Sequence, residues 1–212
     1  GGGSLSVEDI PASGECGSPH SSSTFWTPCP PELVPSTGGS ARGVAILFSS
    51  NLGDVQASVL WKDPRGRGLA IKALIRNIPT IIIAFHADNK ARPDKHWSAD
   101  RAQAESYASL KANVPYHADH EYILLLDANN VPNPDLDEQR VDGGPPVHSH
   151  VLGLAAMREC LAHFGGLRDA FRARCKYKRE YTHNHNGRVG EVTVRRRLDR
   201  AYVGANTLRR GA

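Results

Sequence analysis

Four short apolar runs, rich in β-branched residues and separated by turn-forming residues, constrain this 212-residue chain more than any other feature of its sequence. Runs of this length and composition are typical of β-strands. The Gly, Pro, Asp and Asn residues between the runs are turn formers, so we expect tight turns to connect them. The runs occupy residues 43–48, 57–61, 69–75 and 80–85. Their close spacing predicts an antiparallel meander that feeds a sheet.

Two helices are predicted after this meander. Ser98 can cap a helix over residues 99–113, whose apolar face is mostly alanine. Ser149 can cap a more apolar helix over residues 150–164. The Gly165-Gly166 pair supplies the positive φ that ends such a helix.

Two further strands complete the predicted elements. Residues 121–129 form an apolar strand that ends in polar residues, and residues 191–204 alternate as one last strand. The fold class is therefore α+β with a large, mainly antiparallel component. We expect two sheets that pack face to face and are covered by helices, with residues 43–48 in the central sheet.

Composition divides the chain into a leader and a body. Residues 1–41 are rich in Gly, Ser and Pro and predict a flexible leader, with Trp26 as a candidate anchor, while residues 42–212 form the folded domain. Residues 1–43 carry four acids and one base, and the remainder carries 25 bases against 18 acids. A net charge of +7 on the body is compatible with a polyanionic partner or with an ordinary solvated surface.

Two classes of protein are disfavoured by the same sequence. No apolar run approaches the roughly 20 residues that cross a membrane as a helix, so we expect no membrane span. The four cysteines form no CxxC pair, which argues against a zinc ribbon and favours a reduced, intracellular compartment. Paired histidines, such as His117 with His120, match no standard zinc spacing and are interpreted as solvated loop residues.

The segment ILLLDANNV at residues 123–131 carries the clearest chemistry. Asp127 and Asn129 stand two residues apart at the polar end of a strand, so their side chains leave from the same face. A carboxylate that holds or deprotonates water, beside an amide that donates to a phosphate oxygen, suits phosphodiester hydrolysis. The alternative is that both residues only cap a turn.

The segment VTVRRRLDRAYVG at residues 192–204 is the second informative one. On strand alternation Arg195, Arg197 and Asp199 share one face. Asp199 is either a site residue or the ion-pair partner of the surrounding arginines. The basic C-terminal third predicts nucleic-acid contacts, with a solvated charged surface as the alternative. Its candidate contact residues are Lys176, Lys178, Arg195, Arg196 and Arg197.

Taken in order, six segments resemble the endonuclease/exonuclease/phosphatase superfamily. They are GVAILF, DPRGRGLAIKA, IIIAFHADN, ILLLDANNV, GLRDAFRARCKYKREYTH and RRRLDRAYVG. The order is most similar to the apurinic-endonuclease-like domain of non-LTR (LINE-type) retrotransposons, which shows a GVAIL strand, a GR strand, GDFN, YTW and RIDRIYV. The resemblance covers residues 42–208. It implies a partial two-sheet α/β sandwich and a nuclear, Mg²⁺-dependent phosphodiesterase that acts on DNA.

The resemblance also implies roles for four residues. Asp127 and Asn129 correspond to the Asp and Asn of GDFN, so Asp127 would activate the attacking water and Asn129 would orient the scissile phosphate. Asp199 corresponds to the Asp of RIDR, which orients a catalytic histidine. His86 stands where the family has a tyrosine that contacts the phosphate. Asp169, with the arginine three residues later, corresponds to a mainly structural pair.

The sequence departs from this family pattern in ways that bear on activity. GDFN is here LDAN, no strand carrying the metal-binding Glu precedes residue 43, and the closing SDH motif does not follow. Mg²⁺ would then lack its principal hard ligand, so the metal ligands cannot be named and we expect an impaired or inactive nuclease. The alternative is a domesticated, non-catalytic structural or nucleic-acid-binding subunit of a larger assembly. A protein partner would then cover the sheet edge that the missing strands leave open.

Overall fold

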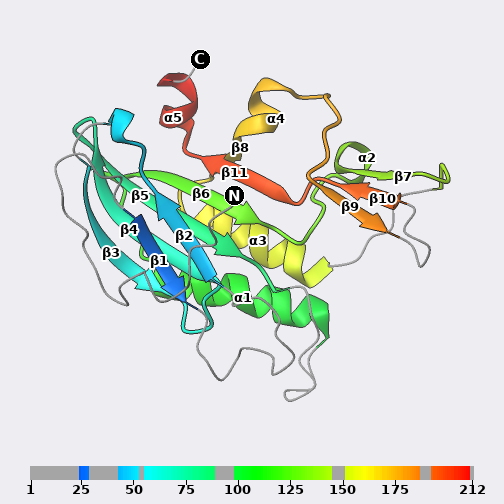
Figure 1. Cartoon of the computed structure of the whole chain (residues 1–212), viewed down its shortest axis with the longest axis horizontal. Helices are drawn as coiled ribbons and strands as arrows, with labels where there is room; N and C mark the ends of the chain where they lie inside the picture. The colour runs from blue at the N-terminus through cyan, green and yellow to red at the C-terminus, as the bar shows by residue number, and fades with distance from the viewer. Residues whose placement is uncertain are drawn as a thin grey trace, which may run out of the picture.

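A six-stranded sheet organises the protein (Figure 1). The computed structural model describes residues 24–28, 43–52, 55–88, 98–144, 151–186 and 192–210. The strand order is β3-β4-β5-β6-β11-β8. The strands are β3 (Gln56–Lys62), β4 (Gly68–Ile75), β5 (Ile78–His86), β6 (Glu121–Asp127), β8 (Arg168–Asp169) and β11 (Asp199–Val203).

The pairing in this sheet brings distant polar residues to one edge. Strands β3, β4 and β5 pair antiparallel, which confirms the predicted meander. Strand β6 lies parallel to β5, because helix α1 (Ala99–Asn113) forms the crossover between them. Strand β11 then runs antiparallel to β6. As a result β5 and β6 end, and β11 begins, at the same edge of the sheet.

Helices α1 and α3 (Val151–His163) pack together over one face of the sheet (Figure 1). The Ser98 hydroxyl accepts a hydrogen bond from the Arg101 amide at 3.2 Å, which confirms the predicted cap of α1. Gly165 and Gly166 have φ of 82° and 73° after α3, as the sequence predicts. The predicted start of this helix at Ser149 lies outside the described residues. The core of this layer is built from Ile81, Ile83, Phe85, Tyr107, Leu110, Leu124, Leu126, Met157 and Cys160.

A two-stranded sheet of β1 (Thr24–Pro28) and β2 (Gly43–Leu47) lies over the opposite face. Its Ile46, with Phe48, packs onto apolar side chains of β4 and β5, including Ile71 and Ile82. The prediction that residues 43–48 belong to the central sheet is therefore wrong. The physical reason is that these side chains are buried against the face of the meander, while the backbone of β2 pairs with β1. Strand β1 lies within the segment expected to be a leader, and the rest of residues 1–41 lies outside the described residues.

A third sheet has the order β7-β10-β9 and consists of β7 (Glu138–Arg140), β10 (Val192–Arg196) and β9 (His183–Asn186). The prediction of one strand over residues 191–204 is wrong, because the chain breaks at Arg197 and changes sheet before β11. The Arg197 amide donates to the Asp137 carbonyl, and its guanidinium is buried between Asp137 and Asp169. These interactions with distant residues redirect the backbone.

The remaining elements are short. They are η3 (Ser50–Leu52), α2 (Pro134–Asp137), α4 (Ala170–Arg174) and α5 (Ala205–Arg210). The observed class is α+β, with helices on one face of the large sheet and a smaller sheet on the other, as the sequence predicts. Within the described residues, no helix has the length and apolar character to cross a membrane.

Candidate active site

His86, Asp127 and Asp199 meet where β5 and β6 end and β11 begins. In the register of the sheet His86 pairs with Asp127, and Asp127 pairs with Asp199. The His86 Nε2 atom lies 3.6 Å from Oδ2 of Asp127. Both side chains stay accessible, with 42% and 34% of their surfaces exposed. All three residues line an open hollow of about 550 Å³, whose wall also includes Leu125 and Val44 of β2.

Asn129 shapes the loop that follows β6. It adopts a left-handed backbone with φ of 45°, which Asn tolerates better than most residues. Its backbone amide donates to Oδ1 of Asp127 at 3.1 Å, and its side-chain Nδ2 donates to the Ala87 carbonyl at 2.9 Å. Asn129 thus fixes one carboxylate oxygen of Asp127 and ties its own loop to the end of β5. The structure therefore places the four predicted residues at one edge of the sheet. The expectation that the side chains of Asp127 and Asn129 leave from one strand face is wrong, because β6 ends at Asp127 and Asn129 lies in the loop that follows it.

Gln103 of α1 holds the same two loops together from inside, and the sequence analysis did not single it out. It is fully buried. Its Nε2 lies within hydrogen-bonding distance of the carbonyls of Asp88, Ala128 and Asn129, at 3.3, 3.2 and 2.9 Å. Its Oε1 accepts from Asn130 Nδ2 at 2.9 Å. The available signal was a polar residue placed one helical turn before Tyr107, on the face of α1 that is buried.

A second buried network supports the end of β5. Arg67 Nε contacts Asp88 Oδ1 at 3.0 Å, and Arg65 Nη1 donates to Asp88 Oδ2 at 2.6 Å. The Arg67 carbonyl accepts from the His86 amide at 2.8 Å, and Arg67 Nη1 donates to the Ala87 carbonyl. Because these bonds fix the backbone on both sides of His86, the imidazole is presented from a rigid strand end.

The arginines of the C-terminal third fall into two groups. Arg197 and Arg200 are buried and form ion pairs with both Asp137 and Asp169, and Arg172 contacts Asp137 as well. Although burial opposes ionisation, the arginines hold the pKa of each of these two carboxyls below its usual range. The cluster is structural, in line with the role expected for Asp169, and Arg197 has no surface to offer to nucleic acid.

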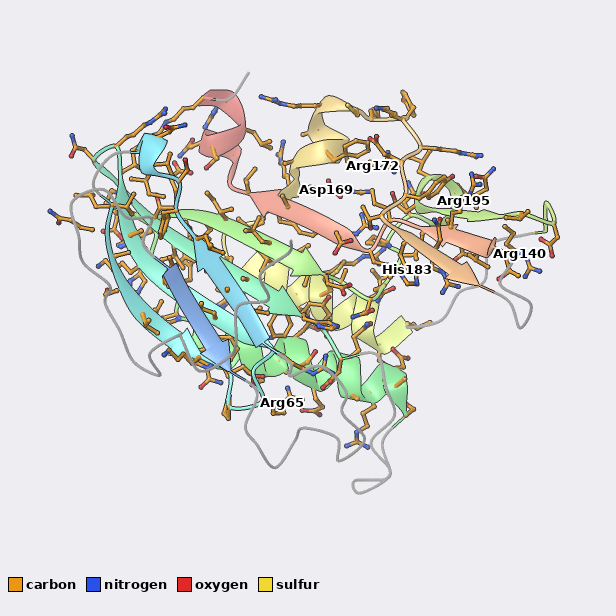
Figure 2. The ribbon with its side chains drawn as sticks, viewed as in Figure 1. Arg65, Arg140, Asp169, Arg172, His183 and Arg195 are labelled. Carbon is orange, nitrogen blue, oxygen red and sulfur yellow. The ribbon has the colours of Figure 1, made fainter. Side chains whose placement is uncertain are left out.

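The other predicted contact residues lie nearer the surface. Arg196 pairs with the buried Glu138 at 2.9 Å, so its guanidinium is largely committed. Arg195 is exposed on β10, where it pairs with Asn184 of β9, and Figure 2 labels it on this small sheet. Lys176 and Lys178 are exposed beyond α4, where Lys178 lies 3.3 Å from Glu180. Arg195 and the two lysines are therefore the accessible members of the predicted set.

The described residues do not by themselves form a metal site. Among them, no group of three or more His, Cys, Asp or Glu side chains is placed to hold a metal ion. Asp127 and Asp199 supply oxygens of the type that Mg²⁺ prefers, but the octahedral shell of that ion needs further ligands. The Mg²⁺ expected from the resemblance thus does not fit these residues alone.

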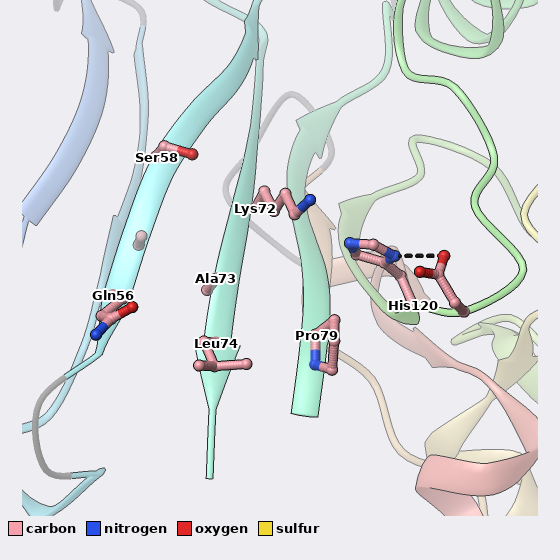
Figure 3. Close-up of a pocket in the computed structure, with 9 residues that line it drawn as sticks. Gln56, Ser58, Lys72, Ala73, Leu74, Pro79 and His120 are labelled. Atoms are coloured by element: carbon pink, nitrogen blue, oxygen red, sulfur yellow. Dashed lines mark hydrogen bonds and ion pairs between the residues drawn. The ribbon is translucent and has the colours of Figure 1, made fainter. Parts of the chain in front are cut away.

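A second open hollow, of about 460 Å³, lies at the opposite end of the meander (Figure 3). It is lined by Gln56, Lys72 and His120. The His120 ring is only 6% exposed, and its Nδ1 lies 2.8 Å from Asp119 Oδ1. The interpretation of His120 as a solvated loop residue is wrong, because the ring packs beside His117 and against the sheet.

Three solved structures share this fold at low sequence identity. An AP endonuclease from Archaeoglobus fulgidus matches with a TM-score of 0.58 and 18% identity, over 89% of this chain and 68% of that one. The 3′ phosphatase NExo from Neisseria, bound to a product DNA hairpin, matches with a TM-score of 0.57 and 18% identity, also over 89% of this chain and 68% of that one. The 3′-5′ exonuclease NExo from Neisseria meningitidis matches with 0.50 and 19%, over 74% of this chain and 60% of that one.

At these identities the likeness establishes the fold alone. The chain has the fold of the endonuclease/exonuclease/phosphatase superfamily, with a multi-strand sheet, a smaller sheet and helical layers. No protein-family model and no curated protein matches the sequence. The chain spans 60 to 68% of the length of the three structures.

Proposed function

We propose that this chain is a phosphodiesterase-type domain that acts on DNA, with Asp127 as its central residue. The observation that carries the proposal is the meeting of Asp127, Asp199 and His86 at one sheet edge, in an open hollow, within a nuclease-type fold. The three solved structures named above are two nucleases and a phosphatase. The placement of the three residues supports hydrolysis at this edge.

In the proposed reaction Asp127 acts as the base toward water. The water gives a proton to Asp127, its oxygen forms the new bond to phosphorus, and the bond from phosphorus to the leaving oxygen breaks. The leaving oxygen takes a proton from solvent. The Asn129 backbone amide donates to Oδ1 of Asp127. The other oxygen, Oδ2, lies on the side of His86 and would take the proton from water. A positioned base contributes about 10² to 10⁴ in rate.

The neighbouring residues would bind and orient the phosphate. His86 would donate through an imidazole N–H to a phosphate oxygen, beside the Asp127 carboxylate, whose Oδ2 lies 3.6 Å from Nε2. Asp199 faces Asp127 across the β6–β11 pair, so it would orient His86 or the water. Asn129 holds the loop through the bond from its side-chain amide to the Ala87 carbonyl, and the second N–H of that amide would direct the scissile phosphate.

The sheet β7-β10-β9 provides the proposed contact surface for DNA. In its register Arg195 lies between Asn184 and Gln139, and all three side chains are exposed. Arg, Asn and Gln are the residues that form paired hydrogen bonds with guanine and adenine edges, and a β-ribbon fits the major groove. Strand β10 ends at Arg196, three residues before Asp199, so DNA bound to this sheet would also reach the catalytic edge. Lys176 and Lys178 would add phosphate contacts.

The origin and partners of the chain are part of the proposal. The order of the six sequence segments supports descent from a LINE-type retrotransposon and action in the nucleus. Leu47 and Leu125 are 67% and 43% exposed, on β2 and on the face of β6 beside it. Apolar surface of this kind supports a protein partner that covers this side of the sheet.

The alternative is a non-catalytic, nucleic-acid-binding subunit. The observation that favours it is the incomplete ligand set for a metal ion within the described residues. In the catalytic version we expect nicking that is slow compared with other nucleases of this fold, and in the non-catalytic version we expect none. The two differ in whether Asp127 has any chemical role.

Plasmid nicking in Mg²⁺ separates the two versions. We expect slow nicking that Asp127→Ala reduces by at least about 100-fold, as expected for loss of a general base. The exposed Asp135, in α2, provides the matched control Asp135→Ala, which should nick like the parent chain. Equal nicking by all three proteins would indicate a contaminant and contradict the proposal. Binding of DNA without any nicking would favour the non-catalytic version.

A further inference from the structure

A third hollow lies on the other side of β11 from the candidate active site. Asp199 and Ala201 of this strand line only the hollow of the candidate active site, Tyr202 lines only the third hollow, and Arg200 lines both. This third hollow is bounded by α2, α3, α4 and β11 and has a volume of about 430 Å³. This size lies within the range of small-molecule sites.

The floor of this hollow is apolar. Leu136 of α2, Met157 and Leu161 of α3, and Tyr202 of β11 contribute it. Met157 and Tyr202 belong to the buried core, so the floor is held rigidly by the packing of α3 on the sheet. Tyr177, which is 74% exposed, stands at the side of the hollow. A rigid apolar floor with one exposed aromatic wall favours a ligand that carries a ring or a compact apolar body.

The rim of the hollow is positively charged. Four cations line the hollow, namely the buried Arg200 together with Arg158, Arg172 and Lys176, against the two carboxylates of Asp137 and Asp169. Both carboxylates are already engaged by buried arginines, as described above. Lys176 lies over the Tyr177 ring at 5.1 Å, and within the described residues neither Lys176 nor Arg158 forms an ion pair. Two cations are therefore available at the mouth.

We infer that this hollow is a binding site for a small organic anion, with an apolar, ring-sized body and one carboxylate, sulfonate or phosphate group. The apolar part lies on Met157, Leu161 and Tyr202, where its burial supplies the hydrophobic contribution. The anionic group lies at the mouth between Arg158 and Lys176. The site is distinct from the candidate active site, because the two hollows lie on either side of β11 and share only the lining residue Arg200.

Anilinonaphthalene sulfonate is a direct probe of this chemistry, since it joins aromatic rings to one sulfonate and becomes fluorescent when the rings leave water. We expect saturable binding of one probe molecule per chain with blue-shifted emission. The double variant Arg158→Glu with Lys176→Glu should bind at least about tenfold more weakly, as expected when two charge contacts are reversed. Arg174→Glu changes an exposed arginine of α4 outside the hollow and should alter the affinity less than about twofold.

Two further measurements decide between this site and general staining of apolar surface. Leu161→Trp, or Leu136→Trp if the first variant melts without cooperativity, fills the hollow and should remove the saturable site. The uncharged phenylnaphthylamine should bind the parent and the charge-reversed variant alike, yet lose its site in the tryptophan variant. Unchanged probe binding in a cooperatively folded tryptophan variant would overturn the inference. An equal loss of probe affinity in Arg174→Glu would also overturn the inference.

Discussion

Replacement of Gln103 by leucine tests whether the loops of the candidate site depend on one buried amide. The change keeps the approximate size of the side chain and removes all of its hydrogen bonds. The carbonyls of Asp88, Ala128 and Asn129 and the Asn130 amide lose their bonds to this side chain. Of these, the Ala128 carbonyl keeps a bond from the Tyr107 hydroxyl at 3.2 Å.

The expected loss follows from the burial of these groups. A buried polar group left without a partner costs about 1 to 3 kcal/mol. Two effects partly offset this loss of stability. The half-buried Asn129 carbonyl can form a hydrogen bond with water, and the leucine side chain gains apolar contacts. We expect Gln103→Leu to lower the free energy of unfolding by about 3 kcal/mol. For a chain of this size the loss corresponds to a decrease of roughly 6 to 12 °C in melting temperature.

Urea denaturation followed by circular dichroism measures this loss. The matched control is Glu105→Leu, an exposed residue of the same helix, which should change stability by less than about 0.5 kcal/mol. If the chain nicks DNA, Gln103→Leu should also lower nicking under native conditions, because the Asp127 loop loses its support. A loss of less than about 1 kcal/mol would refute the reasoning, because it would mean that the loops hold their positions without the amide.

Three more predictions concern charge and reactivity. The arginines lower the pKa of Asp137 in the folded state, so its contribution to stability is present above about pH 4 and is lost as the pH falls through the lowered value. Asp137→Asn should therefore destabilise the fold by about 3 to 5 kcal/mol at pH 7 and by less near pH 3, in urea titrations; a difference that does not change with pH would contradict this. Burial raises the pKa of Cys160 to about 12, so iodoacetamide at pH 8 should label Cys175 well before Cys160 in peptide mass maps, and equal labelling would be the opposite result. Arg195→Ala should weaken binding of duplex DNA by about 1 to 3 kcal/mol and relax its base preference, as expected for an arginine that contacts a base edge, while an unchanged affinity would remove Arg195 from the contact surface.

Local sequence signals accounted for the elements that local forces stabilise. The β-branched runs became the meander β3-β4-β5, the Ser98 hydroxyl caps α1, and the Gly165-Gly166 pair ends α3. The position of Asp127 at the end of a strand was also readable from the change of apolar to polar residues. Each of these features depends on neighbours within a few residues, so a single segment contains the information.

Long-range contacts decided what the sequence alone did not. The chain breaks at Arg197 because its partners Asp137 and Asp169 lie 60 and 28 residues earlier, which alternation along one segment cannot reveal. Gln103 became a support of the site only because the crossover helix places it under two loops. Strand β2 does not belong to the central sheet, because its apolar side chains are buried against the face of the meander. Residue type and periodicity therefore determined which segments form strands and helices, whereas burial and pairing between distant segments decided which polar residues meet.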